Sequence, residues 1–209
     1  MKKMLLLGDS INLHYGSHLE GYLDDDFAIS SKPGKEVALK QIDNAVGGNG
    51  GDSSMVLSYI KELEEKNALN FDVFVFNCGL HDIKRVIPEE NYQISIDEYE
   101  KNLEEIYRIM NKQGIDCVFI TTTPVLERAH NVQIIPAGVK RYNSDVCAYN
   151  EVAVRLAKKY NASVIDLYKF TSRIKGEVYL DYAHFNFEIR KLQAAFIAGG
   201  LLDIYQSWE

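Results

Sequence analysis

The most regular feature of this chain is the alternation of short apolar runs with longer segments whose apolar residues recur every three or four positions. The short runs predict strands at residues 4–7, 73–77, 117–121 and 163–166, with a weaker candidate at 41–46. Strands separated by helices favour right-handed crossovers and a mostly parallel sheet. We therefore predict an α/β fold of the flavodoxin-like, doubly wound kind, with five strands and helices on both faces.

The clearest helical pattern follows Ser95, which is three residues before Glu98 and forms a capping-box sequence with it. Gly114 lies just past the last periodic position and predicts the end of this helix. Its buried face is expected to contain Tyr99, Leu103, Ile106 and Met110.

Two further helices are predicted, at about residues 144–159 and 187–205. In the last one Ile189, Leu192 and Phe196 form an apolar stripe. We expect this stripe to face the core rather than a binding partner.

Composition narrows the function classes. With 209 residues, of which 46% are hydrophobic, the chain can bury one sizeable core, so we predict a single domain over residues 1–209. Lys and Arg number 23 against 30 Asp and Glu, and no basic cluster is present, which argues against nucleic-acid binding.

The cysteines and the N-terminal segment indicate the cellular compartment in which the protein is expected. Three cysteines with no Cys-x-x-Cys spacing argue against a disulfide framework and favour free thiols. The apolar run at residues 4–7 is too short for a signal peptide or a membrane span. We therefore expect a cytoplasmic protein without a membrane span, and we predict no particular oligomeric state.

Two short motifs, 174 positions apart, carry the chemistry. Gly8-Asp9-Ser10 follows the first predicted strand directly, and Asp181 lies three residues before His184 near the other end of the chain. A serine hydroxyl becomes a nucleophile when an imidazole removes its proton, and a carboxylate on the other ring nitrogen orients that imidazole. Ser10, His184 and Asp181 are therefore candidates for these three roles.

Each motif also has a simpler interpretation. Gly-Asp-Ser is ordinary turn chemistry, and this is what the motif alone would favour. Asp-x-x-His is frequent by chance, and a histidine just before a helix can be a surface residue. The catalytic interpretation depends on further motifs between them.

Two such segments lie in the middle of the chain. Residues 44–54 are rich in glycine and precede a helical pattern, so their backbone N–H groups are candidates for an anion hole. They lack the phosphate-loop Gly-Lys-Ser/Thr sequence, and a plain flexible loop is the alternative. Residues 74–82 form a buried strand that ends in a polar tip, Gly79-Leu80-His81-Asp82.

In this order the four motifs resemble the sequence blocks of the SGNH, or GDSL-type, hydrolase superfamily, and the resemblance covers almost the whole chain. It implies that Ser10 is the nucleophile, His184 the general base and Asp181 its orienting partner. It also implies an oxyanion hole made by the backbone N–H groups of Ser10 and Gly51 and a third-block side chain. That side chain is usually asparagine, and here it is His81.

His81 leaves two alternatives open. A neutral imidazole donates one hydrogen bond and an imidazolium two, so His81 can replace the amide donor. Alternatively it only packs within its loop. A base pair of His81 with Asp82 is a minor alternative, because adjacent residues on an extended loop tend to point apart.

Three other residues are expected to line the substrate pocket: Asp9, His14 and Thr123. Thr123 opens a long loop that extends to about residue 142, for which an ordinary connection is the alternative. His14 and His18 are four residues apart, as helical metal ligands can be, but no third ligand is evident, so no metal is predicted.

The resemblance implies a serine esterase acting on small acyl esters through an acyl-enzyme on Ser10, without a cofactor. By analogy we expect an acetyl ester, on a small molecule or a carbohydrate. Two alternatives remain. One is a lipase-like, lysophospholipase or thioesterase activity on longer acyl chains, and the other is a descendant that binds a glycan or acyl ligand without catalysis.

Overall fold

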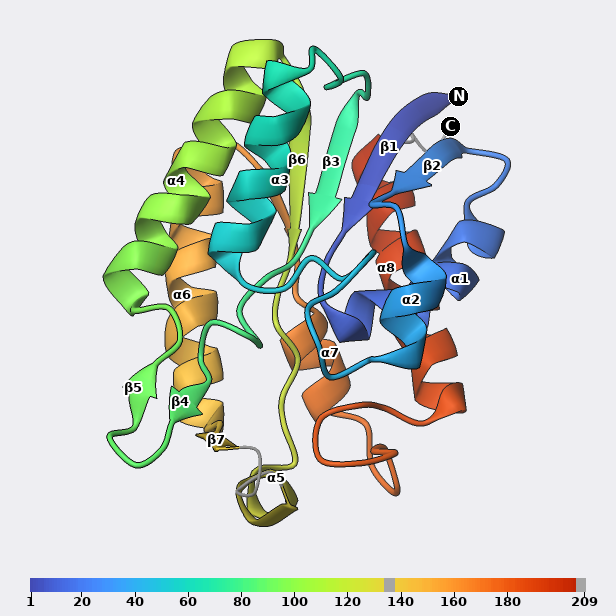
Figure 1. The fold of residues 1–209 in the computed structure, drawn as a ribbon. Coiled ribbons are helices and arrows are strands. Elements are labelled where there is room, and N and C mark those ends of the chain that lie inside the picture. Colours follow the sequence, from blue (N-terminus) through green and yellow to red (C-terminus); the bar gives the residue numbers. More distant parts are fainter. Residues whose placement is uncertain (134–137, 206–209) are drawn as a thin grey trace.

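The computed structural model describes residues 1–133 and 138–205, and a five-stranded sheet lies at its centre (Figure 1). All neighbouring strands of this sheet are parallel. In spatial order they are β2 (Phe27–Ser31), β1 (Lys2–Leu7), β3 (Val73–Phe76), β6 (Asp116–Ile120) and β8 (Ser163–Ile165). This is the predicted α/β fold, with the strand order 2-1-3-4-5 of flavodoxin-like sheets.

One predicted strand is wrong. Residues 41–43 form a turn, in which the N–H of Asn44 donates to the carbonyl of Gln41 at 2.8 Å, and residues 45 and 46 are irregular. The fifth strand is β2, which pairs with β1 at the edge of the sheet. Its pattern is weak because only Phe27 is fully buried, as expected for an edge strand with one face toward solvent.

The longer helices cover both faces of the sheet (Figure 1). On one face α1 (Ser10–Tyr22) packs against α8 (Phe187–Tyr205), and on the other α4 (Ile96–Gln113) lies between α3 (Ser53–Glu65) and α6 (Asn143–Lys159). The shorter helices are α2 (Lys35–Lys40), α5 (Glu127–Gln133) and α7 (Leu167–Ser172). No helix in the described part of the chain is both long and apolar enough to cross a membrane.

Helix α4 begins and ends where the sequence predicts. The Ser95 side chain accepts a hydrogen bond from the N–H of Glu98 at 3.3 Å, and Gly114 adopts the left-handed conformation at φ +68°. Tyr99, Leu103, Ile106 and Met110 are fully buried, as predicted. The predicted cap, the predicted end of the helix and the predicted buried face are therefore all confirmed.

The apolar stripe predicted for α8 is only partly correct. Ile189 is buried, but Leu192 and Phe196 are 47% and 37% exposed. The buried face instead contains Ile189, Gln193, Ala194, Ile197, Ala198 and Leu201. The predicted stripe is displaced because the helix is apolar on more than one face, so hydrophobicity alone does not select the face that packs.

A second, small antiparallel sheet lies beyond the carboxyl end of the main sheet, at the lower left of Figure 1. It is formed by β5 (Asn91–Tyr92), β4 (Arg85–Val86) and β7 (Val139–Lys140). Arg85 of β4 makes two 2.8 Å hydrogen bonds to the carboxylate of Asp145 on α6, which attaches this sheet to the main body.

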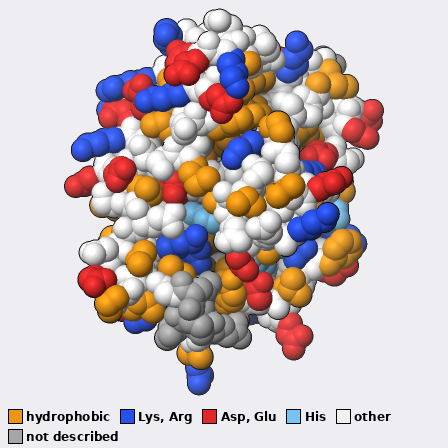
Figure 2. Space-filling model, viewed as in Figure 1, with side chains coloured by type: hydrophobic (Ala, Val, Ile, Leu, Met, Phe, Trp, Pro, Cys, Tyr) orange, Lys and Arg blue, Asp and Glu red, His pale blue; other side chains and the backbone are white. Residues whose placement is uncertain are grey.

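The small sheet also corrects the predicted long loop between residues 121 and 142. That segment contains α5 and β7, and its residues 134–137 lie outside the described residues. Figure 2 shows charged side chains of both signs over the surface, and histidine atoms that reach it near the middle of this face, beside Lys and Arg side chains.

Candidate active site

Ser10 is held at the junction of β1 and α1. It is the first residue of α1, and Asp9 caps the helix by accepting a hydrogen bond from the N–H of Ile11 at 2.9 Å. The glycine at position 8 lets the Asn77 side chain come close to this turn, because a Cβ on Gly8 would lie 1.9 Å from Asn77 Oδ1. The N–H groups of the first helical turn lack intrahelical acceptors, so the N–H of Ser10 is a donor at the site.

Asp181 and His184 belong to a tight loop before α8. The N–H of Leu180 donates to the carbonyl of His184 at 2.7 Å, and Tyr179 forms a β-bridge with Phe185. This loop closes on itself, so the two side chains are brought together within four residues.

The structure joins the first and the last motif through a continuous chain of hydrogen bonds. His184 Nε2 lies 2.9 Å from Ser10 Oγ, and His184 Nδ1 lies 2.8 Å from Asp181 Oδ2. A carboxylate only accepts, so Nδ1 carries the hydrogen and Nε2 is free to accept the proton of the hydroxyl. Ser10 and His184 are 3% and 2% exposed.

Asp181 is kept ionised by its surroundings. Partial burial opposes its charge, but hydrogen bonds from the His184 ring and from the N–H groups of Ala183 and His184 outweigh burial and lower the pKa of Asp181 to about 2. An ionised Asp181 can therefore orient the imidazole and stabilise its protonated form.

The prediction that Asp9 contacts substrate is wrong. Asp9 is completely buried, and its two oxygens accept hydrogen bonds from the N–H of Ile11 and from Asn77 Nδ2 at 3.0 Å. Burial raises the pKa of Asp9, and these bonds partly offset that effect. Its role is to fix the start of α1 and to connect it to the end of β3.

His14 lies next to the candidate base. Its ring centroid is 5.1 Å from that of His184 in an edge-on arrangement, and its Nδ1 is buried without a hydrogen-bond partner among the described residues. Burial, then the Arg190 charge, lowers the pKa of His14 to about 3, so the ring is neutral. Contact between His14 and substrate stays a prediction.

The glycine-rich segment reaches the turn that holds Ser10, but the N–H of Gly51 already donates a hydrogen bond elsewhere. The N–H of Gly50 donates to the Gly8 carbonyl at 2.7 Å, which brings the glycine-rich segment to the nucleophile. The N–H of Gly51 donates to Asn49 Oδ1 at 2.9 Å. Gly51 follows the loop after α2, since the weak strand candidate at residues 41–46 does not form.

His81 lies in the turn that follows β3 and is 2% exposed, and its Nδ1 lies 2.9 Å from the ammonium nitrogen of Lys84. Burial, followed by the charges of Lys84 and Arg141, lowers the pKa of His81 well below its ordinary value. A neutral ring is therefore favoured. The ring does not pair with Asp82, so the alternative base pair has no support in the geometry.

The surroundings of Thr123 and His18 give less information about a role in the site. Thr123 is buried in the segment that follows β6, and its hydroxyl has no hydrogen-bond partner among the described residues. His18 lies edge-on against Phe187, 5.2 Å between ring centroids. No group of three or more His, Cys, Asp or Glu within residues 1–133 and 138–205 is arranged to hold a metal ion.

Sequence reasoning missed several polar residues around the site. Lys84 comes directly before β4 and Arg141 directly after β7. Because Arg85 is opposite Lys140 in the ladder, the next position outward brings Lys84 opposite Arg141. The His81-x-x-Lys84 spacing at a strand end was the available signal. Tyr182 was also missed, and its hydroxyl donates to Asp43 at 2.5 Å, tying the loop of Asp181 to the segment after α2.

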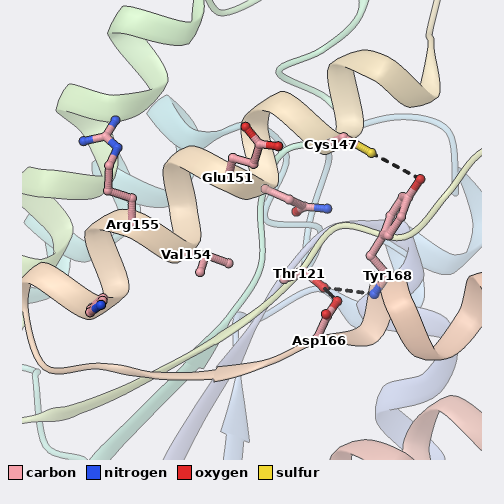
Figure 3. Close-up of a pocket in the computed structure, with 9 residues that line it drawn as sticks. Thr121, Cys147, Glu151, Val154, Arg155, Asp166 and Tyr168 are labelled. Carbon is pink, nitrogen blue, oxygen red and sulfur yellow. Dashed lines mark hydrogen bonds between the residues drawn. The ribbon is translucent and has the colours of Figure 1, made fainter.

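A separate groove of about 490 Å³ lies between α6 and α7 (Figure 3). Two of its hydrogen bonds join lining residues to one another: the Cys147 thiol contacts the Tyr168 hydroxyl at 3.3 Å, and Thr121 Oγ1 donates to Asp166 at 3.2 Å. None of its lining residues belongs to the Ser10 site. This groove therefore has no arrangement suited to the predicted chemistry.

Solved structures with the same fold include several esterases. A lipase/acylhydrolase from Enterococcus faecalis is 21% identical, with 98% of this chain and 97% of the other covered and a TM-score of 0.68. The acetyl xylan esterase AlAXEase is 17% identical, with 95% and 99% covered and a TM-score of 0.68. An acetylxylan esterase from Geobacillus stearothermophilus is 16% identical, with 99% and 95% covered and a TM-score of 0.62. At these identities the likeness establishes the fold alone.

The sequence comparison is more specific. No curated protein matches the chain. The family model described as GDSL-like Lipase/Acylhydrolase matches residues 6–189, which extend from β1 to the first turn of α8 and include all four motifs. The chain therefore belongs to the GDSL-like lipase/acylhydrolase family.

Proposed function

We propose that this protein is a serine esterase that removes small acyl groups, with acetyl esters of small molecules or carbohydrates as the favoured substrates. The observation that carries the proposal is the hydrogen-bonded line from Ser10 Oγ through His184 to Asp181, at 2.9 and 2.8 Å. It gives the hydroxyl a base and gives the base an orienting carboxylate.

The reaction has two halves. In the first, Ser10 Oγ attacks the ester carbonyl, His184 Nε2 takes the hydroxyl proton, and the same proton passes to the departing alcohol oxygen. In the second, His184 takes a proton from water as it attacks the acyl-enzyme. That proton returns to Ser10 Oγ, and the carboxylic acid leaves.

The negative oxygen of each tetrahedral intermediate requires donors. We assign this role to the N–H of Ser10 and to Nε2–H of His81. Because the N–H of Gly51 is bonded to Asn49 Oδ1, it contributes only by sharing its hydrogen between two acceptors.

Two observations support a small acyl group. Ser10 and His184 are almost completely covered, and Tyr182 bonds to Asp43 across the segments on either side of the site. Two proteins of the same fold are acetyl xylan esterases. Their substrate suggests acetylated sugars as the first natural compounds to assay, an analogy of fold.

The test compares p-nitrophenyl acetate, butyrate and octanoate. We expect the highest kcat/KM on acetate, a fall with chain length, and loss of activity in Ser10→Ala and in His184→Ala. Removal of either group typically costs at least about 10⁴-fold. Ser17→Ala, an exposed serine on the same helix, is the matched control and should behave like the parent.

Each outcome separates the alternatives. Ser10-dependent activity that rises with chain length would favour a lipase-like or thioesterase activity instead. Activity that survives Ser10→Ala would contradict the proposed nucleophile. An absence of Ser10-dependent hydrolysis on these esters and on acetylated sugars would favour a binding protein.

A further inference from the structure

We propose that Lys84 is a positioning residue for the oxyanion hole: its ammonium group binds His81 Nδ1 and thereby keeps the hydrogen of the His81 ring on Nε2, the donor to the oxyanion. This inference rests on the proposed esterase function and adds a residue to it.

The geometry of the pair fixes the tautomer. Lys84 Nζ lies 2.9 Å from His81 Nδ1. An ammonium group has three donors and no acceptor, so Nδ1 must offer its lone pair, and a neutral ring then carries its hydrogen on Nε2. Nε2 itself makes no hydrogen bond to any residue in the described ranges, so its hydrogen is available.

Lys84 is held in place by its own backbone. Its N–H donates to the His81 carbonyl at 3.2 Å, and its carbonyl accepts from the N–H of Gln93 at 2.7 Å. Within the described part of the chain, Lys84 forms no ion pair with a carboxylate. The turn therefore directs this side chain to the imidazole instead of to an acidic partner.

The surrounding charges keep the ring neutral. Burial and the nearby Arg141 charge lower the pKa of Lys84 to about 8, so it remains mostly protonated near neutral pH. Two positive groups beside His81 disfavour a second proton on its ring. The result is one oriented donor in a neutral side chain.

The contact between Lys84 and His81 is needed because histidine, unlike asparagine, has two neutral tautomers. An amide always presents its NH₂ group as a donor, whereas a neutral imidazole can place its hydrogen on either nitrogen. With the hydrogen on Nδ1, His81 would direct the lone pair of Nε2 at the oxyanion and repel it. A histidine in the third block thus needs a second residue to select the tautomer, and Lys84 fits this need.

The first test is kinetic. Lys84→Met should lower kcat for p-nitrophenyl acetate by about 10- to 100-fold with little change in KM, because the lost interaction is strongest in the transition state. Lys84→Arg, which also only donates, should keep most of the activity. Lys61→Met, at an exposed position on α3, is the matched control.

Coupling to His81 separates positioning from a general structural role. In a His81→Asn background, Lys84→Met should change kcat less than threefold, since no tautomer remains to be selected. An equal loss in both backgrounds would overturn the inference. Thermal unfolding of each variant identifies any loss that comes from misfolding, and Lys84→Arg then carries the test.

The second test does not depend on activity. Nitrogen-15 NMR of the histidine rings, with His81→Asn used to assign the signals, should show unprotonated Nδ1 and protonated Nε2 for His81 in the parent. Lys84→Met should shift the ring toward the other tautomer. A hydrogen on Nδ1 in the parent would overturn the inference even if the esterase function stands. Ser10-independent hydrolysis with the expected NMR result would instead reject the function and leave the pairing intact.

Discussion

At the scale of single residues, buried polar groups connect the motifs to one another. Asp82 Oδ1 accepts a hydrogen bond from the N–H of Ser53 at 2.9 Å, so the third motif holds the start of α3. Asp52 in turn caps α3 and accepts from Gln93 at 2.6 Å. These acidic residues fix the loops that surround Ser10, and neither is placed to act as a base.

Asp82 gives a prediction about pH and stability. Burial dominates its surroundings and raises its pKa from 3.8 to about 7, because Asp82 is completely buried and one of its oxygens has no partner. The protonated form is therefore favoured by folding. Its contribution to stability is complete below about pH 3.8 and is lost as the pH rises through 7, at a cost of at most about 1.4 kcal/mol per pH unit.

We expect Asp82→Asn to reduce this dependence. Between pH 5 and pH 8 the free energy of unfolding, measured with urea, should fall less in the variant than in the parent. Asp203→Asn, at an exposed position on α8, is the control and should follow the parent curve. Parallel curves for Asp82→Asn and the parent would show that Asp82 is ionised throughout this range.

Residue types at motif positions were predictable, whereas their partners were not. Ser10, His184 and Asp181 stand in recognisable motifs, and the fold brings them together. The assignment of Asp9 to the substrate failed because sequence does not reveal burial. Lys84 was missed because its three-residue spacing from His81 does not by itself show that a turn brings the two side chains into contact.

At the scale of secondary structure, the turn from β1 to α1 positions the nucleophile. Asp9, the cap residue, follows Gly8. The Gly8 carbonyl accepts a hydrogen bond from the N–H of Gly50. The absence of a side chain at Gly8 allows Asn77 to reach Asp9. Three segments far apart in sequence thus meet at one glycine.

Gly8→Ala should therefore impair both stability and catalysis. The added Cβ would lie 1.9 Å from Asn77 Oδ1 and 2.6 Å from Asn12 Cβ, so these buried side chains or the turn must move. Overpacking of this kind typically costs about 1–3 kcal/mol. We expect a lower melting temperature and a lower kcat on p-nitrophenyl acetate.

Gly21→Ala, within α1, is the matched control, since a Cβ there would meet no atom within 4 Å. It should not lower the melting temperature. A Gly8→Ala protein with the stability and kcat of the parent would refute the close approach at this turn.

Strong local signals decided which elements were predictable. Helix α4 has a cap, a regular apolar face and a stop signal, and all three were correct. Strand β2 was missed because an edge strand needs little apolar sequence, and the small sheet was missed because two-residue strands have no period to detect. The β2 error did not affect the site, since Ser10 follows β1 and His81 follows β3.

At the scale of the whole molecule, the parallel sheet explains how distant motifs meet. The carboxyl ends of β1 and β3 lie side by side (Figure 1), and the loop before α8 brings His184 within 2.9 Å of Ser10 Oγ. The small sheet of β4, β5 and β7 adds Lys84 and Arg141 to the same end. The family match over residues 6–189 includes all of these parts.

The central claim is that Ser10 is a nucleophile activated by His184. The most direct test is labelling with a fluorophosphonate, which transfers its phosphonyl group to an activated serine oxygen with loss of fluoride, followed by intact and peptide mass spectrometry. We expect one adduct per chain, on the peptide that contains Ser10, and at least about a hundredfold slower labelling in His184→Ala. No adduct, an adduct on another residue, or equal labelling of His184→Ala would contradict the claim.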